Sequence, residues 1–122
     1  MIRGIGTDII EIDRISIAVK KDYFLKRAFS EGEIVMAKER NTDVFLAGNF
    51  AVKEAFVKAL GIGFRGIGLK DLEVLRDKYG KPFIRICNPE NIHLMDINEK
   101  NIYVSISNTN SLAVAMVVIE VD

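Results

Sequence analysis

The stretch GIGTDIIEIDRI, residues 4–15, places one acid inside an otherwise apolar strand pattern. Residues 2–10 are expected to form a strand in which Ile5, Ile9 and Ile10 are buried. Asp8 lies between them, after two glycines and a threonine. A carboxylate in such surroundings needs a partner. It either accepts hydrogen bonds from backbone amides where the strand ends or belongs to a functional site, and Asp8 alone does not distinguish the two.

The segment after this strand has helical periodicity. Apolar side chains recur at a spacing of about 3.6 residues, which predicts a helix over residues 12 to about 27. The residues expected on its buried face are Ile12, Ile15, Val19 and Tyr23.

A capping box, SEGE at residues 30–33, predicts the start of a second helix. The Ser30 hydroxyl can accept a hydrogen bond from a first-turn amide while the Glu33 carboxylate reaches back to the amide of Ser30. This helix is expected to extend to the RNTD segment, where Thr42 or Asp43 can cap a third helix.

Two hairpins are expected after the helices. LKDLEVLRD and KPFIRIC flank the turn sequence KYG, and residues 88–101 are polar and irregular. IYVSIS at residues 102–107 and LAVAMVVIEV at residues 112–121 flank NTNS and predict a second hairpin. An early strand, a run of helices and two hairpins favour an α+β fold, with helices packed on a mostly antiparallel sheet in one domain spanning residues 1–122.

Composition and charge exclude several classes of protein. The 17 acidic residues balance 17 Lys and Arg, and there is no aromatic-basic motif, so nucleic acid is not an expected partner. The longest apolar run, residues 112–119, is far shorter than the roughly 20 residues that span a bilayer. The single Cys87 cannot form an internal disulfide. We therefore expect a soluble, cytoplasmic protein with no membrane contact.

The segment FLAGNFAVKEAFVKALGIG contains the candidate site. Its helix is expected over about residues 44–60 and ends at Gly61, a favoured residue after a helix C-terminus. Lys53 projects into the middle of the apolar face and Glu54 lies at its edge, where neither charge is favourable without a partner. Lys58 follows Glu54 by one turn, so a solvated Glu54–Lys58 pair is the simple alternative. The apolar face comprises Leu46, Phe50, Val57 and Leu60.

Asp8 and Glu54 are acids on apolar elements that are expected to pack together. Two carboxylates that share a site repel each other, so one must be protonated or a cation must lie between them. Mg²⁺ suits one or two carboxylates together with water and a substrate phosphate. The glycine-rich loop at residues 61–68 follows the same helix, and its amides can approach a phosphate. These residues predict metal-assisted work on a phosphorylated ligand.

Two segments, GIGTDIIEIDRI and FAVKEAFVKALGIG, resemble the hallmark segments of holo-[acyl-carrier-protein] synthases, the small class of 4′-phosphopantetheinyl transferases. FLKRAFSEGEI, GKPFI, VSIS and LAVAMVVIE also occur in the order typical of the family. The resemblance implies the 4′-phosphopantetheinyl transferase fold and a transfer of phosphopantetheine from coenzyme A to a serine of apo acyl carrier protein, with release of 3′,5′-ADP. It also implies Mg²⁺ and a homotrimer with its sites between subunits.

The resemblance assigns roles to individual residues. Asp8 and Glu54 are the implied metal ligands, and they are catalytic together with Lys58, which faces a coenzyme A phosphate. Lys53 is implied to support the site, through its charge or by orienting a carboxylate. A carboxylate or a metal-bound water takes the serine proton, and the sequence leaves both open. The residues implied to contact coenzyme A are Lys53, Lys58, Gly61, Gly63, Ser107, Asn108 and Thr109.

Two positions depart from the family pattern. Asn108 lies where members often have His, and Asn49 lies where members often have Arg. Asparagine forms hydrogen bonds but cannot carry a positive charge. Loss of a guanidinium also removes a bidentate phosphate contact. We therefore expect weaker binding of the 3′-phosphate of coenzyme A than in members that keep both residues.

The first predicted helix offers a partner surface. Residues 14–27 contain five Lys and Arg and one acid, with apolar residues between them. Such a face suits an acidic helical partner, although a solvated face is the simpler alternative. The resemblance favours acyl carrier protein, because Arg14 and this helix match the docking element of the family. The residues predicted to bind it are Arg14, Ile17, Lys21, Phe24 and Leu25.

Other function classes remain open. A non-catalytic sensor or regulatory module can bind a phosphorylated metabolite through the same acids and loop. The departures at Asn49 and Asn108 keep this alternative open. A metal-dependent phosphate-ester hydrolase is a third hypothesis, which differs because it releases product without a carrier protein.

Overall fold

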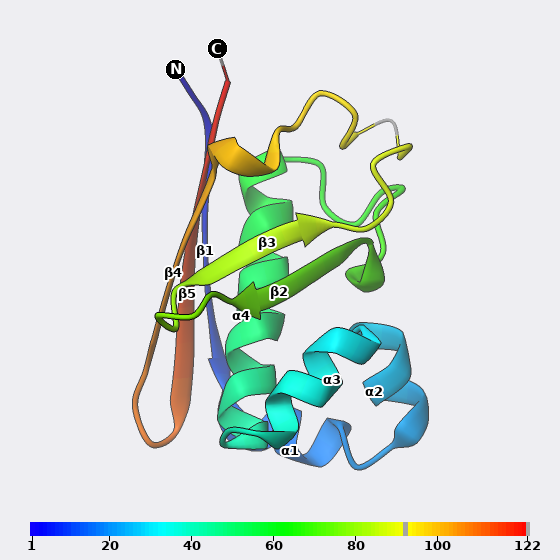
Figure 1. The fold of residues 1–122 in the computed structure, drawn as a ribbon, viewed down its shortest axis with the longest axis vertical. Helices are drawn as coiled ribbons and strands as arrows, with labels where there is room; N and C mark the ends of the chain where they lie inside the picture. The colour runs from blue at the N-terminus through cyan, green and yellow to red at the C-terminus, as the bar shows by residue number, and fades with distance from the viewer. Residues whose placement is uncertain (92, 122) are drawn as a thin grey trace.

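Helix α4 (Thr42–Leu60) is the centre of the fold in the computed structural model, which describes residues 1–91 and 93–121. A three-stranded antiparallel sheet packs on one side of α4, and a two-stranded hairpin crosses another side (Figure 1). Three short helices pack around the first turns of α4. This arrangement confirms the predicted α+β class.

Both predicted hairpins are confirmed. In the three-stranded sheet β5 lies between β1 and β4, so the first strand of the chain pairs with the last. This pairing places the two ends of the chain side by side, and the Met1 amino group donates to the carbonyl oxygen of Val121 at 2.9 Å. The strands are β1 (Ile2–Glu11), β2 (Leu72–Arg76), β3 (Pro82–Ile86), β4 (Ile102–Asn108) and β5 (Leu112–Glu120).

Residues 88–101 connect the hairpin to the sheet. Their described part consists of turns and one 3₁₀ turn, Glu99–Asn101, in agreement with the predicted irregular segment. Ile92 lies outside the described residues. A second 3₁₀ turn, Leu69–Asp71, precedes β2.

The prediction of one helix from residue 12 to about 27 is wrong. The segment forms two helices, α1 (Ile12–Ala18) and α2 (Asp22–Ala28). The break shifts the helical phase, so Tyr23 is 75% exposed instead of buried. Phe24 packs inward in its place, with its ring centroid 6.4 Å from that of Phe29. Burial of these aromatic rings outweighs the continuity of the helix.

Helix α3 (Glu31–Lys38) begins with the predicted capping box. The Glu33 amide donates to the Ser30 hydroxyl at 3.1 Å, and the Ser30 amide donates to Glu33 Oε1 at 3.0 Å. The prediction for the start of α4 is wrong, because the cap is Asn41, whose side chain accepts from the amide of Val44.

The sheet has one covered face and one exposed face. The face toward α4 includes the inward-facing residues of β5, and the opposite face is open. Ile5 and Ile9, which were expected to be buried, are 55% and 62% exposed, because strand alternation turns Gly4 and Gly6 toward α4. The exposed apolar side chains of this outer face include Ile5, Ile9, Tyr103, Val114 and Met116.

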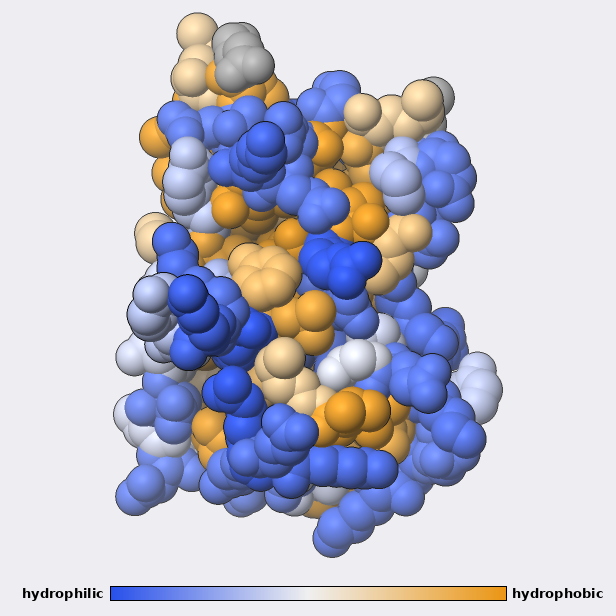
Figure 2. Space-filling model, viewed as in Figure 1, coloured by the Kyte–Doolittle hydropathy of each residue, from blue (hydrophilic) through white to orange (hydrophobic). Residues whose placement is uncertain are grey.

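The surface on the hairpin side is mixed. Figure 2 shows hydrophilic residues over most of this face, with hydrophobic residues between them. In the described part of the chain, no helix has the length and apolarity required to traverse a bilayer.

Close contact between the backbones of β1 and α4 depends on two glycines. A Cβ atom at Gly4 would lie 1.9 Å from the carbonyl oxygen of Ala59, and one at Gly6 would lie 1.8 Å from that of Ala55. Real atoms cannot approach so closely. The small residues therefore let the strand lie directly on the helix, and we call these four residues the glycine–alanine seam.

Replacement of Gly6 by alanine should separate β1 from α4. We expect Gly6→Ala to lower the free energy of unfolding by about 3 kcal/mol or more, because the clash involves backbone atoms that cannot rotate away. Gly68→Ala is the matched control, since Gly68 has φ −99° and its Cβ would meet only Asp71 at 3.9 Å. Denaturant unfolding of both variants measures the difference. Equal losses would contradict a special role for the seam.

Candidate functional site

The seam aligns Asp8 with the middle of α4. Positions 4, 6 and 8 of β1 share one face of the strand, so Asp8 follows the two glycines toward the helix. Lys58 Nζ lies 3.3 Å from Asp8 Oδ1 and donates to the carbonyl oxygen of Thr7 at 3.0 Å. Lys58 of α4 is thus bound to β1 at the position of Asp8.

Glu54 lies one helical turn before Lys58 and interacts with Asp8. Burial raises the pKa of the Glu54 carboxyl, the negative charge of Asp8 raises it further, and Lys58 opposes the shift. The structure therefore brings together the three residues that the sequence singled out as catalytic: Asp8, Glu54 and Lys58.

The donor set of this site fits a magnesium ion. Two carboxylates that repel each other leave a place for a hard cation, and Mg²⁺ commonly takes one or two protein carboxylates and completes its shell with water and phosphate. Within residues 1–91 and 93–121 there is no group of three or more His, Cys, Asp or Glu side chains of the kind that encloses a metal. With Asp8 and Glu54 as its protein ligands, Mg²⁺ would need water and a phosphorylated ligand to complete its shell.

Lys53 lies away from these acids, in the core. Its side chain is 0% exposed, and Nζ is 2.7 Å from Glu33 Oε1 and 2.8 Å from the carbonyl oxygen of Ala28. Burial lowers the pKa of Lys53, and the adjacent Glu33 carboxylate works against this shift. Lys53 thus connects α4 to α2 and α3. The capping box identified Glu33 in the sequence, but nothing in that motif indicated its second bond to Lys53.

The loop glycines have a conformational role. Gly61 and Gly63 have φ values of 78° and 64°, a region that favours glycine, and a Cβ at either position would meet nothing within 4 Å. Gly61 also closes α4, since its amide donates to the carbonyl oxygens of Val57 and Lys58. Contact of this loop with coenzyme A stays a prediction.

The end of β4 and the turn that leads to β5 carry the other predicted contacts. Ser107, Asn108 and Thr109 are all exposed there. The Thr109 hydroxyl accepts from the amides of Ser111 and Leu112 at 3.2 and 3.0 Å, so it stabilises the turn. Asn108 Nδ2 donates to the carbonyl oxygen of Thr109 at 3.1 Å, so Asn108 also contributes to the turn. Contact of Ser107, Asn108 and Thr109 with coenzyme A stays a prediction.

Asn108 lines a cavity of about 280 Å³ between the start of α4 and the two hairpins. Two arginines lie in this cavity, Arg40 and Arg76, and sequence reasoning missed both. The sequence gave only a weak indication of Arg76, because this residue reaches the cavity only when the β2–β3 hairpin has folded across α4. The other lining residues are Asn41, Val44, Phe45, Gly80, Pro82, Ile106 and Ala113.

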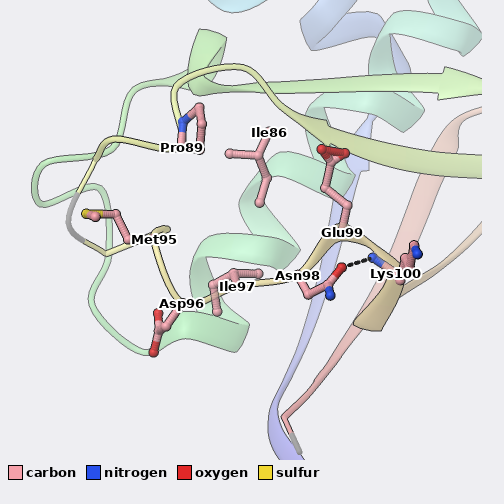
Figure 3. A pocket seen from close by; sticks show the side chains of 8 residues that line it. All are labelled: Ile86, Pro89, Met95, Asp96, Ile97, Asn98, Glu99 and Lys100. Carbon is pink, nitrogen blue, oxygen red and sulfur yellow. Dashed lines mark hydrogen bonds between the residues drawn. The ribbon is translucent and has the colours of Figure 1, made fainter.

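A larger cavity, of about 610 Å³, lies elsewhere, in the segment after β3. Figure 3 shows Asp96 pointing away from Glu99, so the two acids do not converge on one ligand. The Asn98 side chain accepts from the amide of Lys100 at 2.9 Å and so shapes the turn. This cavity contains none of the residues predicted for the site. Its lining is Ile86, Pro89, Met95, Asp96, Ile97, Asn98, Glu99 and Lys100.

The predicted partner surface is partly free. Arg14, Ile17 and Lys21 are exposed, with Ile17 at 64%. Phe24 and Leu25 are half-buried and pack against the core, so they offer only part of their surface. Arg14, Ile17 and Lys21 therefore provide most of the accessible surface of the predicted set.

Comparison with known proteins identifies the family. A model described as 4′-phosphopantetheinyl transferase superfamily matches residues 4–117. The chain belongs to this superfamily. It is 49% identical to the holo-[acyl-carrier-protein] synthase of Clostridium botulinum (strain Eklund 17B) and 46% identical to that of Halothermothrix orenii, covering 99% and 97% of each pair of chains. The chain is accordingly an enzyme, a phosphopantetheinyl transferase of the holo-[acyl-carrier-protein] synthase type.

Solved structures agree with this family and its fold. The holo-(acyl-carrier-protein) synthase of Bacillus anthracis in complex with CoA (3′,5′-ADP) superposes with a TM-score of 0.83 at 36% identity, covering 100% of this chain and 99% of that one. The Helicobacter pylori enzyme in complex with coenzyme A gives 0.82 at 34% identity, with 95% and 99% covered. The predicted 4′-phosphopantetheinyl transferase fold is confirmed.

The buried Lys53–Glu33 pair yields a stability prediction. Lys53→Met should lower the free energy of unfolding by about 3–5 kcal/mol, because Glu33 is left as a buried charge without its cation. Lys26→Met is the matched control, since the Lys26–Asp22 pair is exposed and should contribute about 0.5 kcal/mol or less. Denaturant melts at neutral pH compare the two. A loss for Lys53→Met no larger than the control would show that the pair is not needed.

Proposed function

We propose that this chain transfers the 4′-phosphopantetheine group from coenzyme A to a serine of apo acyl carrier protein and releases 3′,5′-ADP. The convergence of Asp8, Glu54 and Lys58 at the glycine–alanine seam is the observation that carries the proposal. Support also comes from the homologous synthases whose structures contain coenzyme A.

Asp8 and Glu54 would hold Mg²⁺ in this reaction. When bound, the ion neutralises pyrophosphate charge and stabilises the leaving group as a Lewis acid. Lys58 is well placed to assist, because its ammonium group is held by Thr7 and Asp8 while much of its side chain remains exposed. It would neutralise a further phosphate oxygen of coenzyme A.

The transfer is a displacement at phosphorus. The serine oxygen of the carrier attacks the phosphorus atom that bears pantetheine, and a new P–O bond forms. The P–O bond to the other pyrophosphate phosphorus breaks, and its electron pair leaves on 3′,5′-ADP. The serine proton passes to a site carboxylate or to a water molecule of the site. Such reactions depend mainly on alignment and charge stabilisation, which the rigid contact of β1 with α4 provides.

The outer face of the sheet supports a homotrimer with its sites between subunits. The exposed side chains of Ile5, Ile9 and Met116 form part of an apolar surface of the kind that marks an interface. The cavity of about 280 Å³ that is lined by Arg40 and Arg76 includes none of the residues Asp8, Glu54 and Lys58 in its lining. A neighbouring subunit would complete the coenzyme A site by placing its cavity next to these acids.

The exposed basic residues of α1 and the following turn would dock the carrier. Arg14 and Lys21 flank the exposed Ile17, which gives an apolar contact between two positive charges. This pattern is complementary to an acidic helix. We propose it as the docking surface for apo acyl carrier protein.

Isosteric changes at the two acids test the reaction. Asp8→Asn and Glu54→Gln should each lower the rate of carrier modification by more than roughly 100-fold, since even the loss of an outer partner of a metal site costs 10–100-fold. The mass of the carrier after incubation with coenzyme A and Mg²⁺ measures the rate, and a chelator should abolish it. Glu39→Gln, at an exposed acid, is the control.

Each alternative has its own outcome in this assay. Binding of coenzyme A with an unmodified carrier would identify a regulatory module. Release of 3′,5′-ADP without a carrier would identify a hydrolase. Full transfer by both acid variants would contradict the proposed roles of Asp8 and Glu54.

Charge reversal on α1 tests the docking surface. The double variant Arg14→Glu/Lys21→Glu should raise the KM for the carrier roughly tenfold, because like charges then face each other across the interface. The KM for coenzyme A should not change. Lys78→Glu/Lys100→Glu makes the same change in net charge elsewhere. Equal carrier KM values for the two double variants at low salt would refute this surface.

A further inference from the structure

Helix α1, which carries the proposed docking residues Arg14 and Ile17, is too short to determine its own orientation. It has seven residues, and no side chain caps its N-terminus at Glu11. Helices shorter than about 12 residues are marginal on their own, so contacts with the rest of the fold must hold α1. Figure 1 shows α1 at the end of α4 where that helix begins, and the two helices pack against each other.

Burial and one backbone hydrogen bond hold the inner side of α1. Ile12 and Ile15 are 6% and 2% exposed and belong to the apolar cluster that also includes Phe45 of α4. The amide of Ile12 donates to the carbonyl oxygen of Ser111 at 2.9 Å, which fixes the first residue of the helix. Because apolar burial has no preferred direction, these contacts oppose a roll of α1 about its axis only weakly.

A side-chain hydrogen bond one turn after Ile12 supplies a directional constraint. The Ser16 hydroxyl donates to Asp43 Oδ2 at 2.7 Å, and both residues are half-buried. Asp43 lies in the first turn of α4, where its negative charge also suits the helix dipole. Within residues 1–91 and 93–121, no other side chain of α1 forms a hydrogen bond or an ion pair. The bond to Asp43 is therefore the polar side-chain link between α1 and α4.

The position of Ser16 on α1 connects this bond to the docking surface. At about 100° per residue, Ser16 lies at the edge of the buried face, and Arg14 and Ile17 lie on the exposed side. A roll of α1 that broke the bond would turn Arg14 and Ile17 by the same angle. Helix α4 also carries Glu54, so the bond attaches the docking surface and the proposed metal ligand to one helix.

We propose that Asp43 is a positioning residue for carrier docking. Through Ser16 it holds α1 so that a docked carrier presents its serine to the site of Asp8 and Glu54. The inference rests on the proposed function, which makes apo acyl carrier protein the partner of α1. Attack at phosphorus depends on alignment, and a misplacement of about 1 Å can cost roughly 100-fold in rate.

Removal of the hydroxyl tests this role. Ser16→Ala should lower kcat/KM for the carrier roughly fivefold to tenfold, on the scale of one partly exposed hydrogen bond, and leave the Kd for coenzyme A unchanged. Ser16→Thr keeps the hydroxyl and should retain most of the native kcat/KM. Ser111→Ala is the matched control, because Ser111 is exposed and contacts α1 through its backbone carbonyl group. The mass of the carrier measures the rate, and calorimetry measures the Kd.

Two comparisons separate positioning from a general loss of stability. Asp43→Ala should lower kcat/KM as much as Ser16→Ala, and the double variant should lose no more than either single variant, because both changes remove the same bond. The loss should also be equal at low and high salt. The effect of charge reversal at Arg14 and Lys21 should instead shrink at high salt, because salt screens exposed charges.

Other outcomes would overturn the proposal. An unchanged kcat/KM for the carrier in Ser16→Ala shows that α1 needs no such bond, and an equal loss of coenzyme A binding shows that the bond serves only the fold. If the native chain transfers nothing, the proposed reaction fails, and calorimetry with apo carrier protein then decides the positioning role. Weaker carrier binding by Ser16→Ala than by Ser111→Ala supports it, and equal binding refutes it.

Discussion

Direct contact between the backbones of β1 and α4 determines where the candidate site lies. Gly4 and Gly6 remove the side chains that would keep the two elements apart, and Ala55 and Ala59 do the same on the helix. Strand alternation then directs Asp8 toward α4, beside Lys58 and Glu54. The glycines are thus a requirement of the site as well as of the fold, since a wider separation would remove the charge interaction among these residues.

Periodicity and capping patterns predicted most elements because these signals are local. The capping box at Ser30 and the glycine after α4 depend on backbone groups within a few residues of each motif. The break between α1 and α2 is different, because it accompanies the packing of Phe24 on Phe29 and on Phe50, which is distant in the sequence. The sequence also did not predict that Ile5 and Ile9 are exposed. An alternating pattern does not show which face of a strand is covered, and here glycines occupy the covered face.

The candidate site was predictable to the extent that its residues broke a local pattern. Asp8 and Glu54 are acids on apolar elements, and the structure places them together. Lys53 gave the same kind of signal, yet it pairs with Glu33 in the core. A buried charge therefore indicates a partner but not which partner. Arg76 gave only a weak signal, because a charged residue at the end of a strand is ordinary until the hairpin is folded against Phe45 and Asn49.

Consecutive residues of α4 are held on different sides of the helix. Lys53 is bound to Glu33 and Ala28, while Glu54 lies about 100° further round the axis, next to Asp8. Any roll of the helix that moved Glu54 would pull the Lys53 ammonium group out of its buried pair. The internal ion pair thus acts as a rotational lock, and the orientation of Glu54, the proposed metal ligand, is determined by a bond made in the protein interior.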